Sequence, residues 1–244
     1  MSDRGGVVLA VLLAAGTALS AGPDPRALLR QAERGRAGFG EGVLTIRVTL
    51  SGDATKQAPA PARFEVAVKG RKSRVKFLEP GDAGKYLVSS GGGAWLLLPT
   101  ARNPIRIPSS QRVRGGLSVS EISQLSFAED YDAVFEREDD LDGRKCVVLR
   151  LMVKKGVPAS YPVVRVWVDE KERLYRKAIF LLASGRTAKE ATFDAWRIAT
   201  WGPVLERMTV RDALRPGTTV VEYLDYAPRP VPESWFDPKT ARGE

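Results

Sequence analysis

The carboxylates are the side chains of this sequence with the widest chemistry open to them. The 244 residues include 29 Asp and Glu, no histidine and one cysteine, Cys146. Without histidine there is no Ser-His-Asp or Cys-His nucleophile system and no histidine-based metal site. One cysteine allows no thiolate zinc site, CxxC redox pair or internal disulfide. A pair of carboxylates acting as acid and base, as in a hydrolase of a wall polymer, stays open, although no spacing singles out a pair.

The densest acidic stretch, residues 136–142, offers the oxygen ligands that calcium prefers. It lacks the glycine and the distal glutamate of an EF-hand loop in the required register, so we interpret it as a solvated turn. The glycines at 91–93 have no Gly-Lys-Ser/Thr ending and therefore indicate a hairpin turn, not a phosphate loop. We expect no metal and no cofactor.

Basic residues outnumber acidic ones, and the net charge is +9. One basic group is expected to contact a lid, a lipid headgroup or an acidic partner, and a solvated face is the alternative. Its members are Arg102, Arg106, Arg112 and Arg114. A second basic band, a weaker docking candidate, follows a predicted hairpin. Its members are Lys69, Arg71, Lys72, Arg74 and Lys76.

The first 22 residues have the features of a secretory signal peptide. Arg4 precedes an apolar stretch at residues 7–19, and small residues around Ser20 offer a cleavage site. The apolar stretch is shorter than the roughly 20 residues that span a bilayer. We predict a cleaved signal peptide at 1–22 and a single domain at 23–244, with an uncleaved anchor as the alternative. An exported chain is not expected to bind nucleic acid.

Alternation of apolar and polar residues predicts the elements that must position any site. Period-two patterns begin at Gly42 and continue beyond residue 218, with turn signals every eight to twelve residues. Short helices are predicted at 24–34, at 118–127 and as a turn near 232–236. Together they predict a mainly β (α+β) fold, a curved antiparallel incomplete barrel of about eleven strands covered by short helices and enclosing an apolar cavity.

The residues expected to face that cavity are the apolar members of the alternating strands. They are Leu44, Ile46, Val48, Phe64, Val66, Val75, Phe77, Trp95, Leu97, Phe180 and Phe193. Contact with acyl chains is the functional interpretation, and plain core packing is the alternative. The helix at 118–127 is a candidate lid whose Ile122, Leu125 and Phe127 plug the cavity, or else an ordinary covering helix.

Three blocks of sequence resemble one known family. They are residues 84–87, 94–99 and 106–108, then 164–169 and 184–186, then Pro203, Met208, Asp212 and 235–238. In this order they are similar to the outer-membrane lipoprotein-sorting proteins, relatives of the periplasmic carrier LolA. The resemblance covers most of the chain after the leader.

The resemblance implies a non-enzymatic, monomeric periplasmic carrier or chaperone without metal or cofactor. Such a carrier takes acyl chains of lipoproteins or lipids into an apolar half-barrel and passes them toward the outer membrane. An inner-membrane transporter and an outer-membrane acceptor would then be its partners. Related half-barrels also act in envelope-stress sensing, so a sensor or protein-interaction module is the alternative function.

Overall fold

The fold is built on one large antiparallel sheet. The computed structural model describes residues 24–37, 40–51, 59–108, 111–114, 117–118, 126–157 and 159–242. Thirteen strands pair in the order β6-β5-β4-β3-β2-β1-β15-β14-β13-β12-β11-β10-β9, and β7 pairs with β8 in a separate two-stranded sheet. Strands that follow one another pair from β1 to β6 and again from β9 to β15, and β15 returns to pair with β1, so that β6 and β9 are the two edges of the sheet. This is the antiparallel meander that the sequence predicts.

The strands have the following bounds. In the first half they are β1 (Glu41–Ser51), β2 (Ala62–Lys69), β3 (Lys72–Phe77), β4 (Tyr86–Ser90), β5 (Gly93–Leu97), β6 (Ile105–Ile107), β7 (Arg112–Arg114) and β8 (Leu117–Ser118). In the second half they are β9 (Tyr131–Leu141), β10 (Arg144–Val153), β11 (Val163–Asp169), β12 (Tyr175–Leu181), β13 (Thr187–Ala199), β14 (Gly202–Asp212) and β15 (Thr218–Pro228).

The described residues include two α-helices, α1 (Pro25–Ala37) and α3 (Phe127–Asp130), and the 3₁₀ turns η1 (Pro80–Asp82) and η2 (Glu233–Phe236). Asp24 begins α1, since its carboxylate accepts from the Arg26 amide at 3.0 Å and its carbonyl from the Leu28 amide at 3.0 Å. Leu28, Leu29 and Ala32 are buried on one side of this helix. Through that side, α1 contacts β9, β11, β12 and β14.

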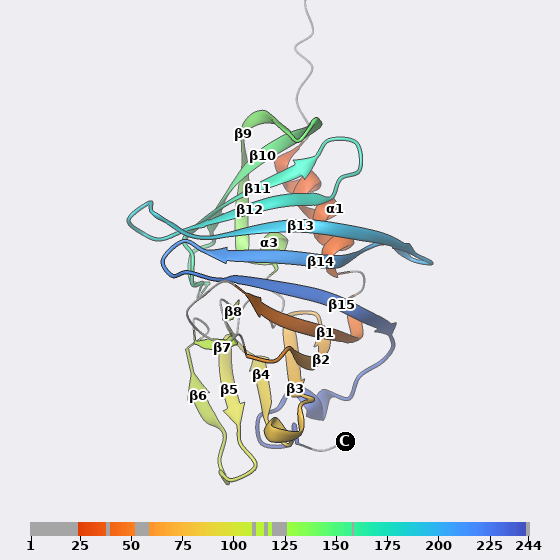
Figure 1. Cartoon of the computed structure of the whole chain (residues 1–244), viewed down its shortest axis with the longest axis vertical. Coiled ribbons are helices and arrows are strands. Elements are labelled where there is room, and N and C mark those ends of the chain that lie inside the picture. Colours follow the sequence, from red (N-terminus) through yellow and green to blue (C-terminus); the bar gives the residue numbers. More distant parts are fainter. Residues whose placement is uncertain are drawn as a thin grey trace, which may run out of the picture.

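An ion pair between Arg71 and Asp130 shows how strongly the sheet is bent. Arg71 lies in the turn after β2 and Asp130 directly before β9, and their side chains are 2.5 Å apart. β9 is eight steps from β2 in the strand order, so a flat sheet would separate them by roughly 38 Å. Figure 1 shows the same bending, because β2 to β6 stand almost upright whereas β13 to β15 run across the view.

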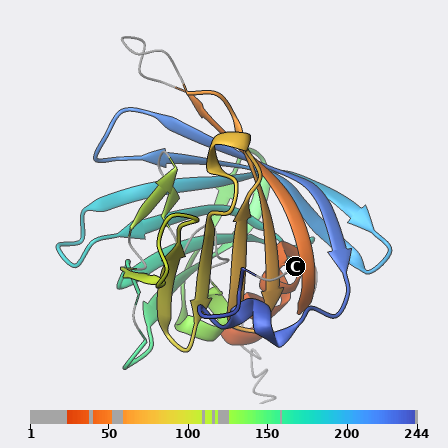
Figure 2. The same cartoon turned by 90° about the horizontal axis from the view of Figure 1, so that it is seen from below.

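The two faces of the sheet are buried differently. One face carries a large apolar cluster that includes residues from α1, α3 and most strands. The other face, over β1 to β5, is covered by the C-terminal segment at 229–242, which packs Val231 and Phe236 on Val43 and Ala67. Figure 2 shows this dark blue segment passing alongside β3 and β4.

The sequence-based prediction needs three corrections. The sheet has 13 strands and not about eleven, and β6, with only three residues, is too short for its alternation to predict a strand. Ser118 ends β8 and Phe127 begins α3, so no single helix runs from 118 to 127, and residues 119–125 lie outside the described part. The acidic stretch at 136–142 is mostly strand and not turn, because residues 136–141 belong to β9 and only 142–143 form the turn.

The predicted signal peptide lies outside the described residues. Neither helix in the described part of the chain has the length and apolar character needed to cross a membrane.

Candidate ligand pocket

A pocket of about 380 Å³ opens among β2 to β7. The apolar side chains that line it are Phe64, Phe77, Leu87, Leu96, Leu98, Ile107 and Val113, and the polar ones are Asp82, Lys85 and Gln111. Its volume falls in the range of about 300–1,000 Å³ that small-molecule sites occupy. Its composition, mostly apolar with a few polar groups, is also typical of such sites.

Strand register brings the pocket residues together. Phe64 of β2 is paired with Phe77 of β3, and their rings meet edge to face with centroids 5.1 Å apart. Leu87 and Leu96 are direct partners across β4 and β5, and Leu96 also pairs with Ile105 of β6. Because paired residues share a face, the inner surfaces of five strands converge on one apolar wall.

The polar groups of the pocket come from the connection between β3 and β4. Asp82 ends η1, and its carboxylate accepts from the Lys85 ammonium at 2.5 Å. Both side chains are about one third exposed, so the pair faces solvent and pocket together. The pocket can therefore hold an apolar group while offering one cation and one anion to a polar end.

Most residues predicted to face inward do share one buried cluster on that side of the sheet. They are Leu44, Ile46, Val48, Phe64, Val66, Val75, Phe180 and Phe193, with Phe77 packed against them. Among the described residues, only Phe64 and Phe77 of the predicted set line the pocket itself. The structure thus places Leu44, Ile46, Val48, Val66, Val75, Phe180 and Phe193 in the packed cluster beside the pocket.

Trp95 and Leu97 face the opposite way from the sequence-based expectation. Both pack against Tyr86, Val88 and Ala241 on the outer side, under the C-terminal segment. Their neighbours Ala94 and Leu96 belong to the inner cluster instead. The predicted phase of β5 is therefore wrong by one residue, because every residue from 94 to 98 is apolar and alternation carries no information there.

Phe127 is the lid residue that the structure describes, and it is buried. Its ring meets those of Tyr131, Tyr175 and Phe180 with centroids 6.1, 5.6 and 6.1 Å away. Aromatic side chains therefore fill the inner face near α3. Ile122 and Leu125, the other predicted lid residues, lie outside the described part of the chain.

The predicted arginine group is spread over the edge of the sheet. Arg102 is exposed in the connection from β5 to β6, and Arg106 is exposed in β6 opposite Trp95. Arg112 and Arg114 pair β7 with β8 through their backbones, and their side chains are outside the described part. The second basic band is engaged in contacts within the protein. Arg71 pairs with Asp130, and Lys69 and Lys72 both pair with Glu233. The guanidinium of Arg74 lies over the rings of Tyr86 and Trp235.

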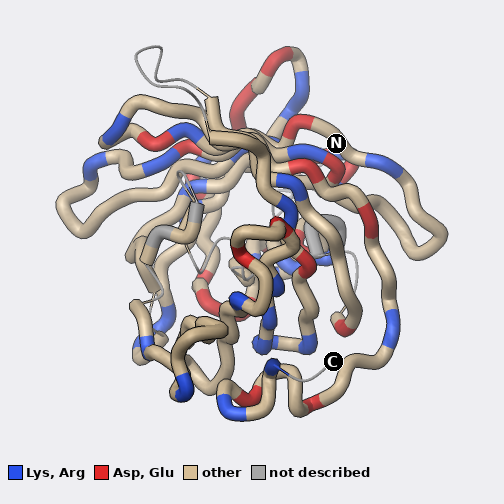
Figure 3. The backbone as a smooth tube through the Cα atoms, turned by 60° about the horizontal axis from the view of Figure 1, so that its bottom comes forward, with Lys and Arg blue, Asp and Glu red and all other residues tan. Residues whose placement is uncertain are grey.

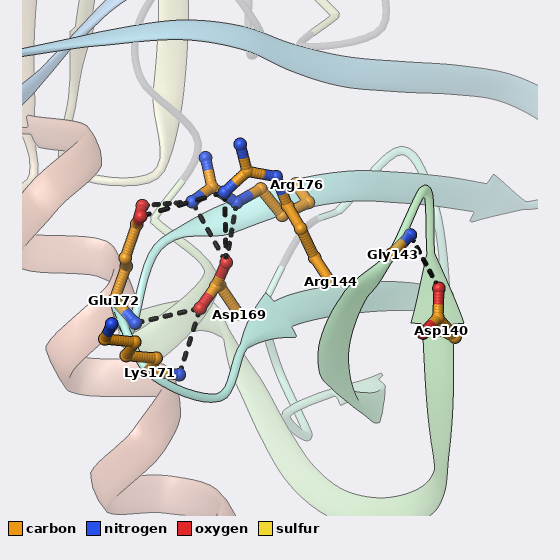
Figure 4. A network of polar contacts seen from close by, with 7 residues as sticks. All are labelled: Asp140, Gly143, Arg144, Asp169, Lys171, Glu172 and Arg176. Atoms are coloured by element: carbon orange, nitrogen blue, oxygen red, sulfur yellow. Dashed lines mark hydrogen bonds and ion pairs between the residues drawn. The ribbon is translucent and has the colours of Figure 1, made fainter.

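Two acidic side chains, Asp169 and Asp140, hold turns through hydrogen bonds to backbone amides. Figure 4 shows Asp169 at the end of β11, where its carboxylate accepts from the amides of Lys171 and Glu172 at 2.9 and 2.8 Å. Arg176 donates to the other oxygen at 3.0 Å. Asp140 accepts from the Gly143 amide at 2.7 Å in the turn between β9 and β10.

Asp139 of β9 also accepts hydrogen bonds from neighbouring side chains. Asp139 accepts from the Trp167 indole at 2.9 Å, and this hydrogen bond, with that from Arg137, lowers the pKa of Asp139. In the described part of the chain, no three Asp, Glu or Cys side chains cluster in a way that could hold a metal ion.

The sequence analysis missed Leu87, Leu96, Leu98, Ile107 and Val113 as pocket residues, and also the polar pair at its rim. Lys85 belongs to the block at 84–87 that resembles the lipoprotein-sorting proteins, and no sequence pattern singles out Asp82. Pairing of β4 with β5 and of β5 with β6 supplies the missing information.

Comparisons with known proteins identify the fold. A family model described as "Uncharacterized protein" and marked "-like" matches residues 69–240. A LolA superfamily protein from Nitrosomonas europaea superposes with a TM-score of 0.81 at 24% identity, covering 87% of this chain and 97% of that chain.

Two further solved structures are similar. A DUF1329 family protein from Desulfovibrio piger has a TM-score of 0.73 at 20% identity, covering 88% of this chain and 98% of that one. An outer membrane lipoprotein-sorting protein domain from Vibrio parahaemolyticus has a TM-score of 0.74 at 16% identity, covering 90% and 98%. A comparison with curated protein sequences gives no match.

Proposed function

The chain belongs to the family whose model matches residues 69–240 and has the fold of the LolA superfamily, and from this premise we propose that it is a periplasmic carrier of acylated cargo. In this proposal the bent sheet is an incomplete barrel, and the pocket between β2 and β7 receives hydrocarbon. The chain works by binding and release, without catalysis, as a monomer exported through cleavage after residue 22.

The pocket is the observation that carries the proposal. Seven of its ten lining side chains are apolar, so the pocket offers an apolar wall to an inserted chain. At roughly 30 Å³ for each water-sized group, about 380 Å³ accommodates around a dozen methylenes. Each buried methylene is worth about 0.8 kcal/mol before ordering costs, so one acyl chain supplies useful affinity.

The polar pair at the rim suits the junction between an acyl chain and its headgroup. With hydrocarbon against Leu87 and Leu96, the polar end of the cargo lies near Lys85 and Asp82. The Lys85 ammonium can then exchange the Asp82 carboxylate for an anionic or carbonyl oxygen of the cargo. Release to a membrane or to an acceptor restores the internal ion pair.

Native mass spectrometry of the mature chain, purified without detergent, tests the proposal. We expect co-purified lipid, and competition between that lipid and a dansyl-labelled fatty acid added to the delipidated protein. Repeated recovery of empty protein that takes up no labelled fatty acid would falsify the carrier proposal. A stable protein complex without lipid would favour an interaction or sensor module instead.

A further inference from the structure

The turn between β13 and β14 differs from the other tight turns of this sheet, because its positive-φ glycine, Gly202, follows the two turn residues and is not one of them. Two residues, Thr200 and Trp201, join these strands. The other described two-residue turns, at 70–71, 91–92 and 142–143, contain glycine with positive φ. Such turns favour Gly, Asn and Asp, because these residues adopt positive φ most readily. Tryptophan has no such preference, so turn geometry does not account for Trp201.

Apolar side chains are unusually exposed at this tip. Ile198 is 82% exposed and Trp201 is 44% exposed, although burying large apolar side chains is the main driving force of folding. Residues 198–205 read Ile-Ala-Thr-Trp-Gly-Pro-Val-Leu and carry no charge, in a chain that is 27% charged. In Figure 3 the hairpin that projects at the right is tan at its tip, with blue and red only further back.

The hairpin stands away from the body of the protein. Figures 1 and 2 both show the β13–β14 turn extending past the ends of neighbouring strands. Leu224, an exposed residue of β15, adds a further apolar side chain on the adjacent strand.

We propose that this tip, residues 198–202, inserts into the headgroup region of an anionic membrane. Tryptophan prefers that depth, since its ring is apolar and its indole N–H bonds to water and headgroups. An uncharged tip has no charge to desolvate on entering. The +9 net charge attracts the chain to anionic lipid, and this attraction weakens as salt rises.

The inference does not depend on the pocket, because the tip would bring the chain to a bilayer whatever it carries. Its test uses the full mature chain and sucrose-loaded vesicles of phosphatidylcholine with a minority of phosphatidylglycerol. The variant combines Ile198→Ser with Trp201→Ser. The matched control is Leu214→Ser, which removes a 47% exposed leucine from the turn at the opposite end of β14.

We expect the wild type and Leu214→Ser to sediment with anionic vesicles, and the double variant to bind at least about tenfold more weakly. Brominated lipid should quench part of the wild-type tryptophan fluorescence, and Trp201→Phe should remove that part while retaining binding. Thermal unfolding followed by circular dichroism confirms that each variant is folded. A wild type that ignores vesicles, a double variant that binds as the wild type does, or unchanged quenching in Trp201→Phe overturns the proposal.

Discussion

The carboxylate of Glu33 accepts a hydrogen bond from the backbone amide of Phe127 at 2.9 Å. Glu33 lies in α1 and Phe127 is the first residue of α3, so one helix caps the other. The same oxygen is 3.2 Å from the hydroxyl of Tyr175 in β12, which donates to it. Lys154 binds the carbonyls of Ala128 and Glu129 at the far end of α3. The short helix is therefore fixed at both ends by distant residues.

Removing that cap should destabilise the region around α3. We expect Glu33→Ala to lower the free energy of unfolding by about 2 kcal/mol, because it leaves a buried tyrosine hydroxyl and a helix amide with one acceptor fewer. Glu33→Gln keeps an amide oxygen and should cost less than half as much. Urea unfolding of the three proteins measures the difference. Equal losses in the two variants would show that the charge, and not the acceptor, matters.

Asp169 provides a prediction with a pH dependence. Burial by itself raises the pKa of Asp169, but hydrogen bonds from the Glu172 amide and from Arg176 outweigh it and hold the pKa below its ordinary value. A carboxyl whose folded pKa is lowered stabilises the fold above the unfolded pKa of about 3.9 and loses this contribution as the pH falls.

The isosteric variant Asp169→Asn should therefore lose about 2–3 kcal/mol near neutral pH and much less below about pH 4. Glu172→Gln, which removes the exposed partner of Arg176, serves as the control and should cost under about 1 kcal/mol at either pH. Urea unfolding of the wild type and both variants, near neutral pH and below about pH 4, gives the loss of stability for each variant at each pH. A penalty for Asp169→Asn that stays constant into acid would contradict the assigned role of the charge.

The local sequence pattern predicts which side chains of a strand face inward when only one face of the strand is apolar. It cannot predict this when both faces of the strand are apolar. Apolar residues alternate with other residues along 163–169, the segment that forms β11. In β5 the pattern fails, because its outer face is buried by a contact with Ala241, which comes from the end of the chain. Long-range contacts, which no window of sequence contains, decide these cases.

The corrected phase of β5 gives adjacent leucines opposite roles. Leu96 lines the pocket, whereas Leu97 is fully buried on the other face. Under the proposed function, Leu96→Gln should weaken uptake of a dansyl-labelled fatty acid by about tenfold with a small change in stability, because it places an amide in an apolar wall. Leu97→Ala should cost about 2–4 kcal/mol of stability and leave the affinity intact. The reverse pattern would place the ligand elsewhere.

Cys146 should be inert in the folded protein. Its side chain is 2% exposed, and burial raises the pKa of its thiol to about 11. Since the thiolate is the reacting species, modification by a thiol reagent near pH 8 should be at least about a hundredfold slower in the folded state than in denaturant. Ser184→Cys places a thiol in an exposed turn and should add a fast phase. A fast reaction of the wild type would mean that β10 opens locally.

The rim of the pocket allows a test of what the cargo presents to the protein. Lys85 and Asp82 form an ion pair there, so substituting either frees the other to face the ligand. Lys85→Met should lower the affinity of the protein for a dansyl-labelled fatty acid roughly three- to tenfold. The affinity of this variant for the matched alcohol should equal that of the wild type. Asp82→Asn should raise the affinity for the acid, because the ammonium no longer has an internal carboxylate to neutralise it. If the substitutions change the affinities for acid and alcohol equally, the ion pair only shapes the rim. If the wild type binds neither ligand, the result counts against the proposed carrier function.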